Sequence, residues 1–173
     1  MDRCDSQGAA TCRECSVISK LLLGLALMAA CVVVHASGLT WALRRLREPL
    51  RPGATFWSLT WICIRLAAWM ILCHMIEICL WGLLYVWRGA MPDVQSAFYF
   101  SAVTYTTTGY GDLVLPPEWR IVGGVEALTG ILMCGASTAF FFAVLSRVHA
   151  MDVDQPGARP PTPTGKTDQG RGV

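Results

Sequence analysis

The sequence predicts an all-α membrane protein with three membrane-spanning helices and one shorter helix that enters the membrane without crossing it. Apolar residues make up 54% of the 173 residues and only 15% are charged, against about 25% in ordinary soluble domains. The apolar residues gather in three blocks, over residues 17–41, 57–87 and 121–148. Each block exceeds the roughly 20 residues that cross a hydrocarbon core about 30 Å thick. We therefore expect an integral membrane protein.

The connector after the first block predicts how the chain is oriented. A first transmembrane helix is expected over residues 17–43, and the connector over residues 44–56 carries four arginines against the single acid Glu48. Basic residues in short loops stay in the cytoplasm. The polar segment 1–16 is then outside. We expect a multi-pass protein of the cell (inner or plasma) membrane with its C-terminus in the cytoplasm.

The first block also resembles a secretory signal peptide. Lys20 precedes the apolar run of residues 21–34, and Val34-His35-Ala36 has the form of a cleavage site. Cleavage would leave two spans and place the arginine-rich connector outside. The charge rule opposes that arrangement, so we interpret the block as a retained helix.

The cysteines give only a weak indication of a metal site. Five of the eight lie inside the apolar blocks, where a thiol behaves as a small hydrophobe. Cys12 and Cys15 form one CxxC pair with no second pair to complete it. A zinc site is therefore weakly supported, and a disulfide or inert thiols are the plainer interpretation.

A half-length helix is predicted inside the region 57–148, between an outer helix at 57–88 and an inner helix at 120–148. It covers residues 93–106 and begins at Asp93, a good N-cap. About twelve helical residues extend only about 18 Å. Backbone that re-enters a membrane is tolerated where protein or water surrounds it. Its C-terminal end carries about half a negative charge, which favours a cation nearby.

The segment after this half-helix, residues 107–112, has the sequence Thr-Thr-Gly-Tyr-Gly-Asp. Glycine adopts backbone conformations that other residues resist, and alternating such residues turns successive carbonyls to one side. The segment resembles the selectivity filter of the potassium channels, commonly Thr-Val-Gly-Tyr-Gly-Asp. The chain is similar over residues 57–148 to the bacterial potassium channels with two helices per pore loop, with one additional helix in front. An ordinary glycine-rich loop is the alternative.

The resemblance implies a role for each filter residue. Thr107 would offer its hydroxyl and carbonyl at the cavity end, and the K+ sites above it would be formed by the carbonyls of Thr108, Gly109 and Tyr110. Gly111 would close the outer end. Asp112 would stand beside the outer mouth. Threonine at 108 replaces the more common valine or isoleucine, which puts the packing behind the filter in question.

The inner helix contains small residues with two interpretations. By family position Gly130 is one residue from a glycine proposed as a gating hinge, whereas close helix packing is the alternative use of small residues. The resemblance also places Leu132, Gly135 and Ala139 on the lining of the cavity.

Three ionisable side chains are predicted inside the membrane and could support the pore. Glu77 and Glu126 sit deep in their spans, where charge is costly and usually paired or functional. His74 precedes Glu77 by three residues and shares its helix face. The pair is either a proton-sensitive support behind the pore or a structural hydrogen bond between helices.

The function predicted is passive, potassium-selective transport by a homotetramer in the lipid bilayer, because each chain supplies one filter strand. No cofactor is expected besides K+ as the permeant ion, and neither catalytic residues nor a nucleic-acid site stand out. The alternatives are a weakly selective cation channel and a non-conducting regulatory or scaffold subunit that docks a partner through its first helix. The tail over residues 149–173 is rich in proline and glycine and is expected to be disordered.

Overall fold

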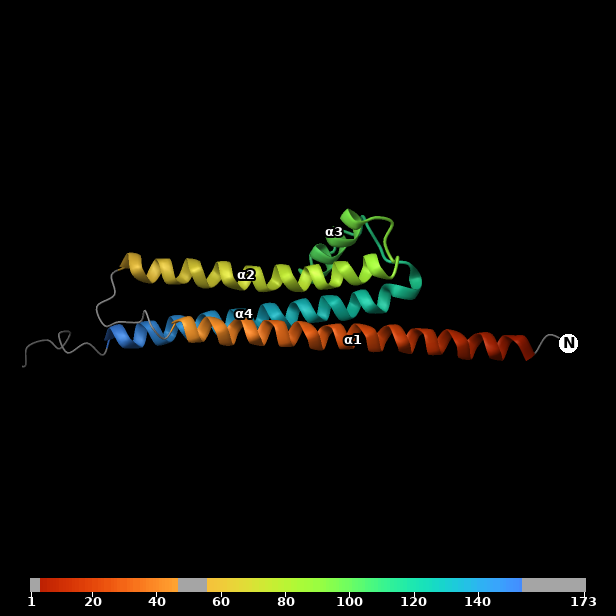
Figure 1. The fold of residues 1–173 in the computed structure, drawn as a ribbon, viewed down its shortest axis with the longest axis horizontal. Coiled ribbons are helices and arrows are strands. Elements are labelled where there is room, and N and C mark those ends of the chain that lie inside the picture. Colours follow the sequence, from red (N-terminus) through yellow and green to blue (C-terminus); the bar gives the residue numbers. More distant parts are fainter. Residues whose placement is uncertain (1–3, 47–55, 154–173) are drawn as a thin grey trace, which may run out of the picture.

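The computed structural model describes residues 4–46 and 56–153, and within these ranges every regular element is helical. Figure 1 shows three long helices lying along one another and a short helix at one end of the bundle. The elements are α1 (Cys4–Leu46), α2 (Phe56–Trp87), α3 (Val94–Tyr105), the 3₁₀ turn η1 (Pro117–Trp119) and α4 (Arg120–Val153).

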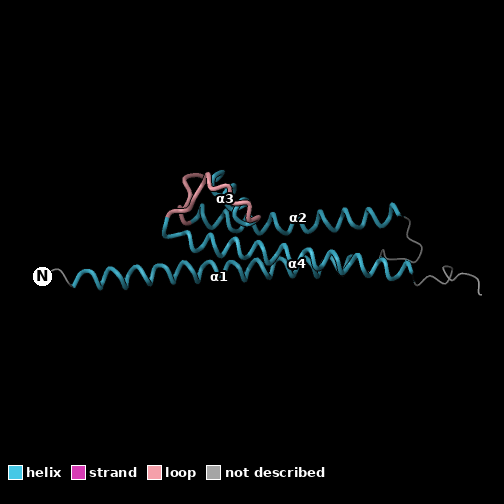
Figure 2. The backbone as a smooth tube through the Cα atoms, turned by 180° about the vertical axis from the view of Figure 1, so that it is seen from behind, coloured by secondary structure: helices cyan, strands magenta, loops and turns pink. Residues whose placement is uncertain are grey.

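The three long helices are each able to cross a membrane. Their apolar spans are Ser16–Arg45, Thr60–Trp87 and Pro117–Arg147. α1 has 43 residues and is therefore about 65 Å long, more than a bilayer requires. Its N-terminal part extends past the ends of α2 and α4 (Figures 1 and 2). The predicted all-α membrane fold with three spanning helices is confirmed.

The element boundaries differ from the predicted ones at both ends of the chain. Residues 4–16, expected as a polar segment before the first span, belong to α1. Residues 149–153, expected in a disordered tail, continue α4. Both helices extend beyond the apolar blocks because backbone hydrogen bonds within a helix form in polar sequence as well as in apolar sequence. The rest of the predicted tail and most of the connector lie outside the described residues.

α1 packs along both α2 and α4, and α3 packs into the angle between α2 and α4. Small residues permit the close approach. A Cβ atom at Gly38 would lie 2.5 Å from the Cys73 sulfur across the α1–α2 contact, and the Trp69 indole donates a hydrogen bond to the Gly38 carbonyl at 2.9 Å. The additional helix is therefore an integral part of the bundle.

The best-buried side chains lie in the half of the bundle that contains α3. Trp81 and Tyr85 of α2, Tyr105 of α3 and Val122 of α4 are all fully buried. This core fixes α3 between the two helices that flank it, and so determines where the loop after α3 stands.

Candidate functional site

α3 begins at a well-formed cap. The Asp93 carboxylate accepts hydrogen bonds from the Ser96 backbone N–H at 2.8 Å and from the Ser96 hydroxyl at 2.7 Å. These bonds stabilise the ionised carboxylate and lower the pKa of Asp93. The helix has 12 residues, from Val94 to Tyr105, and Thr106 is its C-cap. It follows the N-cap Asp93, and it is too short to cross a membrane.

The loop after α3 has an alternating backbone. Thr107, Gly109 and Gly111 have φ angles of +59°, +57° and +77°, whereas Thr108 and Tyr110 between them have negative φ. Glycine adopts positive φ without strain, but a β-branched threonine does so only where its surroundings impose it. The positive φ values thus fall at every second residue, as expected if alternating residues turn successive carbonyls to one side. All five residues are exposed in the single chain, so these groups are open to a ligand or a neighbouring subunit.

Hydrogen bonds to α3 hold the lower part of this loop. The carbonyl of Val103 accepts from the backbone N–H groups of Thr108 at 3.0 Å and Gly109 at 3.2 Å. The Thr108 hydroxyl lies 2.9 Å from the hydroxyl of Thr106. The residue that departs from the usual filter pattern thus pairs with the threonine that caps α3.

A second contact holds the outer end of the loop. The Tyr99 hydroxyl donates a hydrogen bond to the Asp112 carboxylate at 2.8 Å, and this bond raises the pKa of Tyr99. Tyr99 was not identified from the sequence as a site residue. The sequence pattern that could have identified it is a tyrosine in the predicted half-helix, 13 positions before the acid of the filter-like segment.

The residues expected to line the cavity share one face of α4. Leu132, Gly135 and Ala139 are exposed in the single chain, and nothing lies within 4 Å of the position that a Cβ atom would take on Gly135. This face is free to line a cavity or to contact another subunit. That they line a cavity remains a prediction.

Gly130 lies against the last residue of α3. A Cβ atom added there would stand 1.8 Å from the carbonyl oxygen of Tyr105, a distance that no atom pair tolerates. Close packing of α4 against the end of α3 therefore explains why a residue without a side chain is needed at position 130. Because alanine would displace α3, a Gly130→Ala variant does not test the hinge hypothesis on its own.

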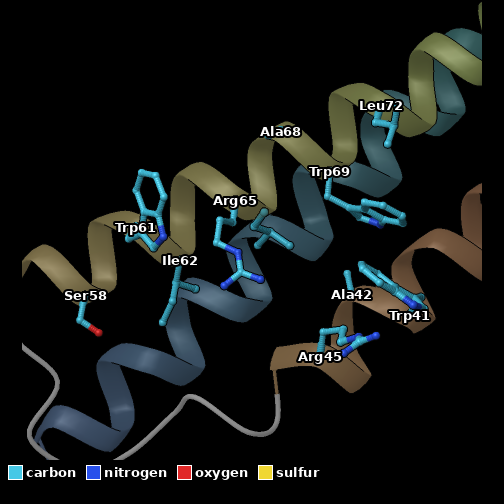
Figure 3. Close-up of a pocket in the computed structure, with 11 residues that line it drawn as sticks. Trp41, Ala42, Arg45, Ser58, Trp61, Ile62, Arg65, Ala68, Trp69 and Leu72 are labelled. Atoms are coloured by element: carbon cyan, nitrogen blue, oxygen red, sulfur yellow. The ribbon is translucent and has the colours of Figure 1, made fainter.

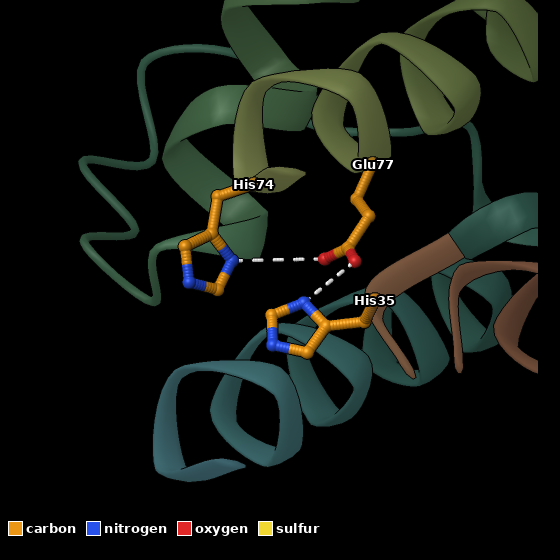
Figure 4. A group of neighbouring side chains, drawn as sticks. All are labelled: His35, His74 and Glu77. Carbon is orange, nitrogen blue, oxygen red and sulfur yellow. Dashed lines mark hydrogen bonds and ion pairs between the residues drawn. The ribbon is translucent and has the colours of Figure 1, made fainter. Parts of the chain in front are cut away.

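A buried polar cluster joins α1 and α2 beside the end of α3 (Figure 4). The Nδ1 atom of His35 lies 2.9 Å from Oε1 of Glu77, and Nδ1 of His74 lies 3.6 Å from Oε2. The Tyr105 hydroxyl donates a hydrogen bond to the same Oε2. Ser137 of α4 completes the cluster, since its hydroxyl oxygen lies 3.0 Å from Nε2 of each histidine.

The sequence indicated His74 and Glu77 but not His35. We considered His35 only as part of a cleavage-like triplet, although an ionisable residue inside a span is itself a functional signal. His35, His74 and Glu77 offer ligand atoms within 4.8 Å of one another and could share a metal ion. Hydrogen bonds already explain their close contacts, so we interpret the cluster as a hydrogen-bond network.

The second buried acid has a separate set of partners. Glu126 of α4 accepts a hydrogen bond from the Tyr85 hydroxyl at 2.7 Å and contacts the Ser101 hydroxyl of α3 at 2.5 Å. Ser101 also donates to the Ile78 carbonyl at 2.9 Å. Glu126 thus links α2, α3 and α4 and lies apart from the histidine cluster.

A groove of about 470 Å³ lies between α1 and α2 at the end of the bundle away from α3 (Figure 3). The guanidinium groups of Arg45 and Arg65 lie in it, and Arg45 stands 5.2 Å from the ring of Trp41. Both arginine side chains are exposed. The groove takes no part in the arrangement around the filter-like loop.

Comparison with known proteins places this geometry in context. Residues 64–147, slightly under half of the chain, match the family described as ion channel. The potassium voltage-gated channel protein Shal of Drosophila melanogaster is 38% identical over 60 residues, which are 33% of this chain and 10% of that protein. The potassium voltage-gated channel protein shk-1 of Caenorhabditis elegans is 49% identical over 41 residues, 23% of this chain and 8% of that protein.

These matches identify a domain and not a whole protein. The matched part spans about a tenth of the length of the two relatives. No solved structure matches the chain. The matched range begins in α2 and ends in α4, and so contains the half-helix and the alternating loop. Residues 64–147 are therefore similar to an ion-channel domain, and to short stretches of potassium channels, within a multi-pass membrane protein.

Proposed function

We propose that the protein is the subunit of a potassium-selective channel that conducts K+ passively as a homotetramer. The observation that carries the proposal is the alternation of φ at Thr107, Gly109 and Gly111. This alternation lies directly after a helix too short to cross the membrane, and it supports a segment whose carbonyls face one way. Such a strand is the element from which a ring of ion-coordinating carbonyls is built.

The proposed sites follow from that strand. The hydroxyl and carbonyl of Thr107 and the carbonyls of Thr108, Gly109 and Tyr110 would replace the water shell of K+. One strand covers only one side of an ion, so four chains around a closed rotational axis are needed. The C-terminal end of α3 adds a partial negative charge below the filter, which favours a cation. K+ is in this proposal the permeant ion and no resident cofactor is required.

Two alternatives give different results in the same assay. A weakly selective channel would use the same strand with looser packing, and Thr108 is the residue that favours this alternative. A non-conducting subunit would use α1 to dock a partner, but α1 already packs on α2 and α4 through Gly38 and His35. Most of the α1 span is nevertheless exposed in the single chain, so the flux assay has to decide between a conducting and a non-conducting subunit.

The test is K+ flux through purified protein in liposomes, with Na+ as the competing ion. Gly109→Ala should abolish selective flux, because alanine at a φ of +57° is strained although nothing lies within 4 Å of the added methyl group. The matched control is Gly124→Ala. Gly124 is a helical glycine of α4 with equally open surroundings and no positive φ.

The outcomes separate the candidates. Flux that collapses when Na+ replaces K+, and that survives Gly124→Ala but not Gly109→Ala, supports the proposal. Equal flux of both ions discards selectivity and keeps the pore. Verified tetramers that never conduct would contradict the proposal and favour a regulatory subunit.

A further inference from the structure

The cluster around Glu77 brings together polar side chains from all four α-helices. His35 comes from α1, His74 and Glu77 from α2, Tyr105 from α3 and Ser137 from α4. His35 and Glu77 have 3% and 0% of their side chains exposed, and His74 has 18%. A cluster that joins every helix and excludes water holds the helices together only if its hydrogen bonds are complete.

The contacts need more hydrogens than the neutral side chains supply. Each hydrogen-bonded contact requires one hydrogen between its two atoms. The Glu77 carboxylate makes two such contacts, with His35 and Tyr105, and the Ser137 hydroxyl makes two, with His35 and His74. The fifth contact joins His74 and Tyr105. With Glu77 ionised, the two hydroxyls and two neutral imidazoles offer one hydrogen each. Five contacts need five hydrogens, but the side chains supply only four. One contact therefore lacks a hydrogen in every arrangement.

One additional proton completes the cluster. On an imidazole it makes an imidazolium, which donates from both ring nitrogens, and the cluster then carries one positive and one negative charge. On Glu77 it would make a neutral acid that donates to His35 and leaves both rings neutral, and the ring-nitrogen spectra below distinguish this arrangement from the first. Without the proton, one contact at Ser137 or Glu77 sets two lone pairs against each other, and a net negative charge stays buried in the membrane, which is costly.

We propose that His35, His74 and Glu77 form a proton-binding site, and that the two histidines are positioning residues for the filter. The step from the site to the filter runs through Tyr105. Its hydroxyl is held by Glu77 and His74, its carbonyl packs on Gly130, and it is the last residue of α3 before Thr106 and the filter-like loop. This consequence for the filter rests on the proposed channel function.

Loss of the proton should therefore weaken the support of the filter. An uncompensated charge at Glu77 and a broken contact at Ser137 loosen α1 and α4 from the cluster, and Tyr105 loses fixed partners. The other titratable groups facing Glu77 are the thiols of the cysteines that interact with it electrostatically: Cys31 of α1, Cys73 of α2 and Cys134 of α4. No basic side chain among the described residues forms an ion pair with Glu77 other than the two histidines. The proton is thus the available compensation for the carboxylate.

The first arm of the test is the pH profile of K+ flux with a chelator present. Wild-type flux should fall at least about fivefold from pH 6 to pH 9, because the cluster loses the proton that completes its hydrogen bonds. His35→Asn together with His74→Asn should conduct at the low level of the cluster without its proton and show a flat profile, since an amide cannot take up a proton. His149→Asn makes the same chemical change at the third histidine of the chain and should keep the wild-type profile.

The second arm does not depend on conduction. The protein is labelled with ¹⁵N-histidine in the His149→Asn background, so that only His35 and His74 report. At neutral pH their ring nitrogens should show one imidazolium between them, and Glu77→Gln should leave two neutral rings. This measurement detects the additional proton directly. A hydrogen bond with a merely structural role would not supply that proton.

Two results would overturn the proposal: a wild-type flux profile that is flat from pH 5 to pH 9, or two neutral rings across that range. A profile that changes when the chelator is omitted would assign the cluster to a metal ion and overturn it as well. If no variant conducts at any pH, the proposed channel function fails, and the nitrogen spectra alone decide whether the proton site exists.

Discussion

At the scale of single residues, the two buried glutamates differ in their protonation. The Ser101 hydroxyl has one hydrogen and two neighbours, the Ile78 carbonyl and Oε1 of Glu126. A carbonyl only accepts, so Ser101 donates to Ile78 and the second hydrogen must come from Glu126. We infer that Glu126 is neutral and donates to Ser101, whereas the proposed proton site holds Glu77 ionised.

This difference predicts opposite responses to the same substitution. Glu126→Gln should change the free energy of unfolding by less than about 1 kcal/mol, because the amide donates to Ser101 and accepts from Tyr85 as the neutral acid does. Glu77→Gln removes the charge that the histidines compensate and should cost several times more. Thermal unfolding of the detergent-solubilised protein measures both. Equal losses would show that Glu126 is ionised.

The sequence predicted single residues well only where a local pattern defines them. Residues 107–112 are recognisable because their chemistry is contiguous, and His74 with Glu77 because three residues separate them on a helix. His35 and Glu77 are 42 positions apart, and no spacing rule connects two helices whose relative rotation is unknown. The support of Tyr105 by this cluster therefore required the structure.

At the scale of helices, the α1–α2 contact depends on a glycine that faces a cysteine. Gly38→Ala would place a methyl carbon 2.5 Å from the Cys73 sulfur, while the Trp69 hydrogen bond to the Gly38 carbonyl prevents the helices from sliding apart. We expect a loss of about 1–3 kcal/mol from overpacking, measured as a lower thermal unfolding midpoint.

Two further variants identify the cause of that loss. Adding Cys73→Ala should restore most of the stability, because it removes the sulfur that the methyl group meets. Gly24→Ala on the same helix should be tolerated, since its Cβ would meet Val122 and Val125 at ordinary contact distances of 3.6–3.7 Å. If the double variant does not regain stability, the loss caused by Gly38→Ala does not come from the contact with Cys73.

The α3–α4 contact predicts a stronger effect. Gly130→Ala would place its methyl carbon 1.8 Å from the Tyr105 carbonyl oxygen, and backbone cannot move aside as a flexible side chain can. We expect both a lower thermal midpoint and a loss of flux, whereas Gly124→Ala on the same helix should keep both. An unchanged midpoint together with altered open probability would instead restore the hinge interpretation.

The helices themselves were predictable because each follows from continuous sequence: an apolar block of sufficient length, or an N-cap and a glycine-rich end. Their pairing was not predictable. Small residues at Gly38 and Gly130 indicate that something approaches closely, but not which helix it is. The sequence did not show that the first helix packs on α2 and α4, and whether its exposed face also contacts a partner remains a prediction.

At the scale of the whole molecule, the two ends of the bundle carry different charges. The end away from α3 gathers the exposed side chains of Arg44, Arg45, Arg65 and Arg147. The end beside α3 holds the acids Asp93, Asp112 and Glu118 together with the bases Lys20, Arg88 and Arg120, and Lys20 and Arg88 both lie over the Trp119 ring, so its charges balance. Because basic residues stay in the cytoplasm, the filter-like loop should face the outside.

Labelling of intact cells with a membrane-impermeant thiol reagent tests this orientation. In a background without native cysteines, Glu118→Cys should react in intact cells, because position 118 is exposed at the α3 end. Ser146→Cys, exposed near the opposite end of α4, should react only after the membrane is permeabilised. The reverse pattern would place the arginines outside and the filter-like loop in the cytoplasm, as cleavage of the first block would have required. Reaction of both positions in intact cells would mean that the protein inserts in two orientations, which the arginine-rich end should prevent.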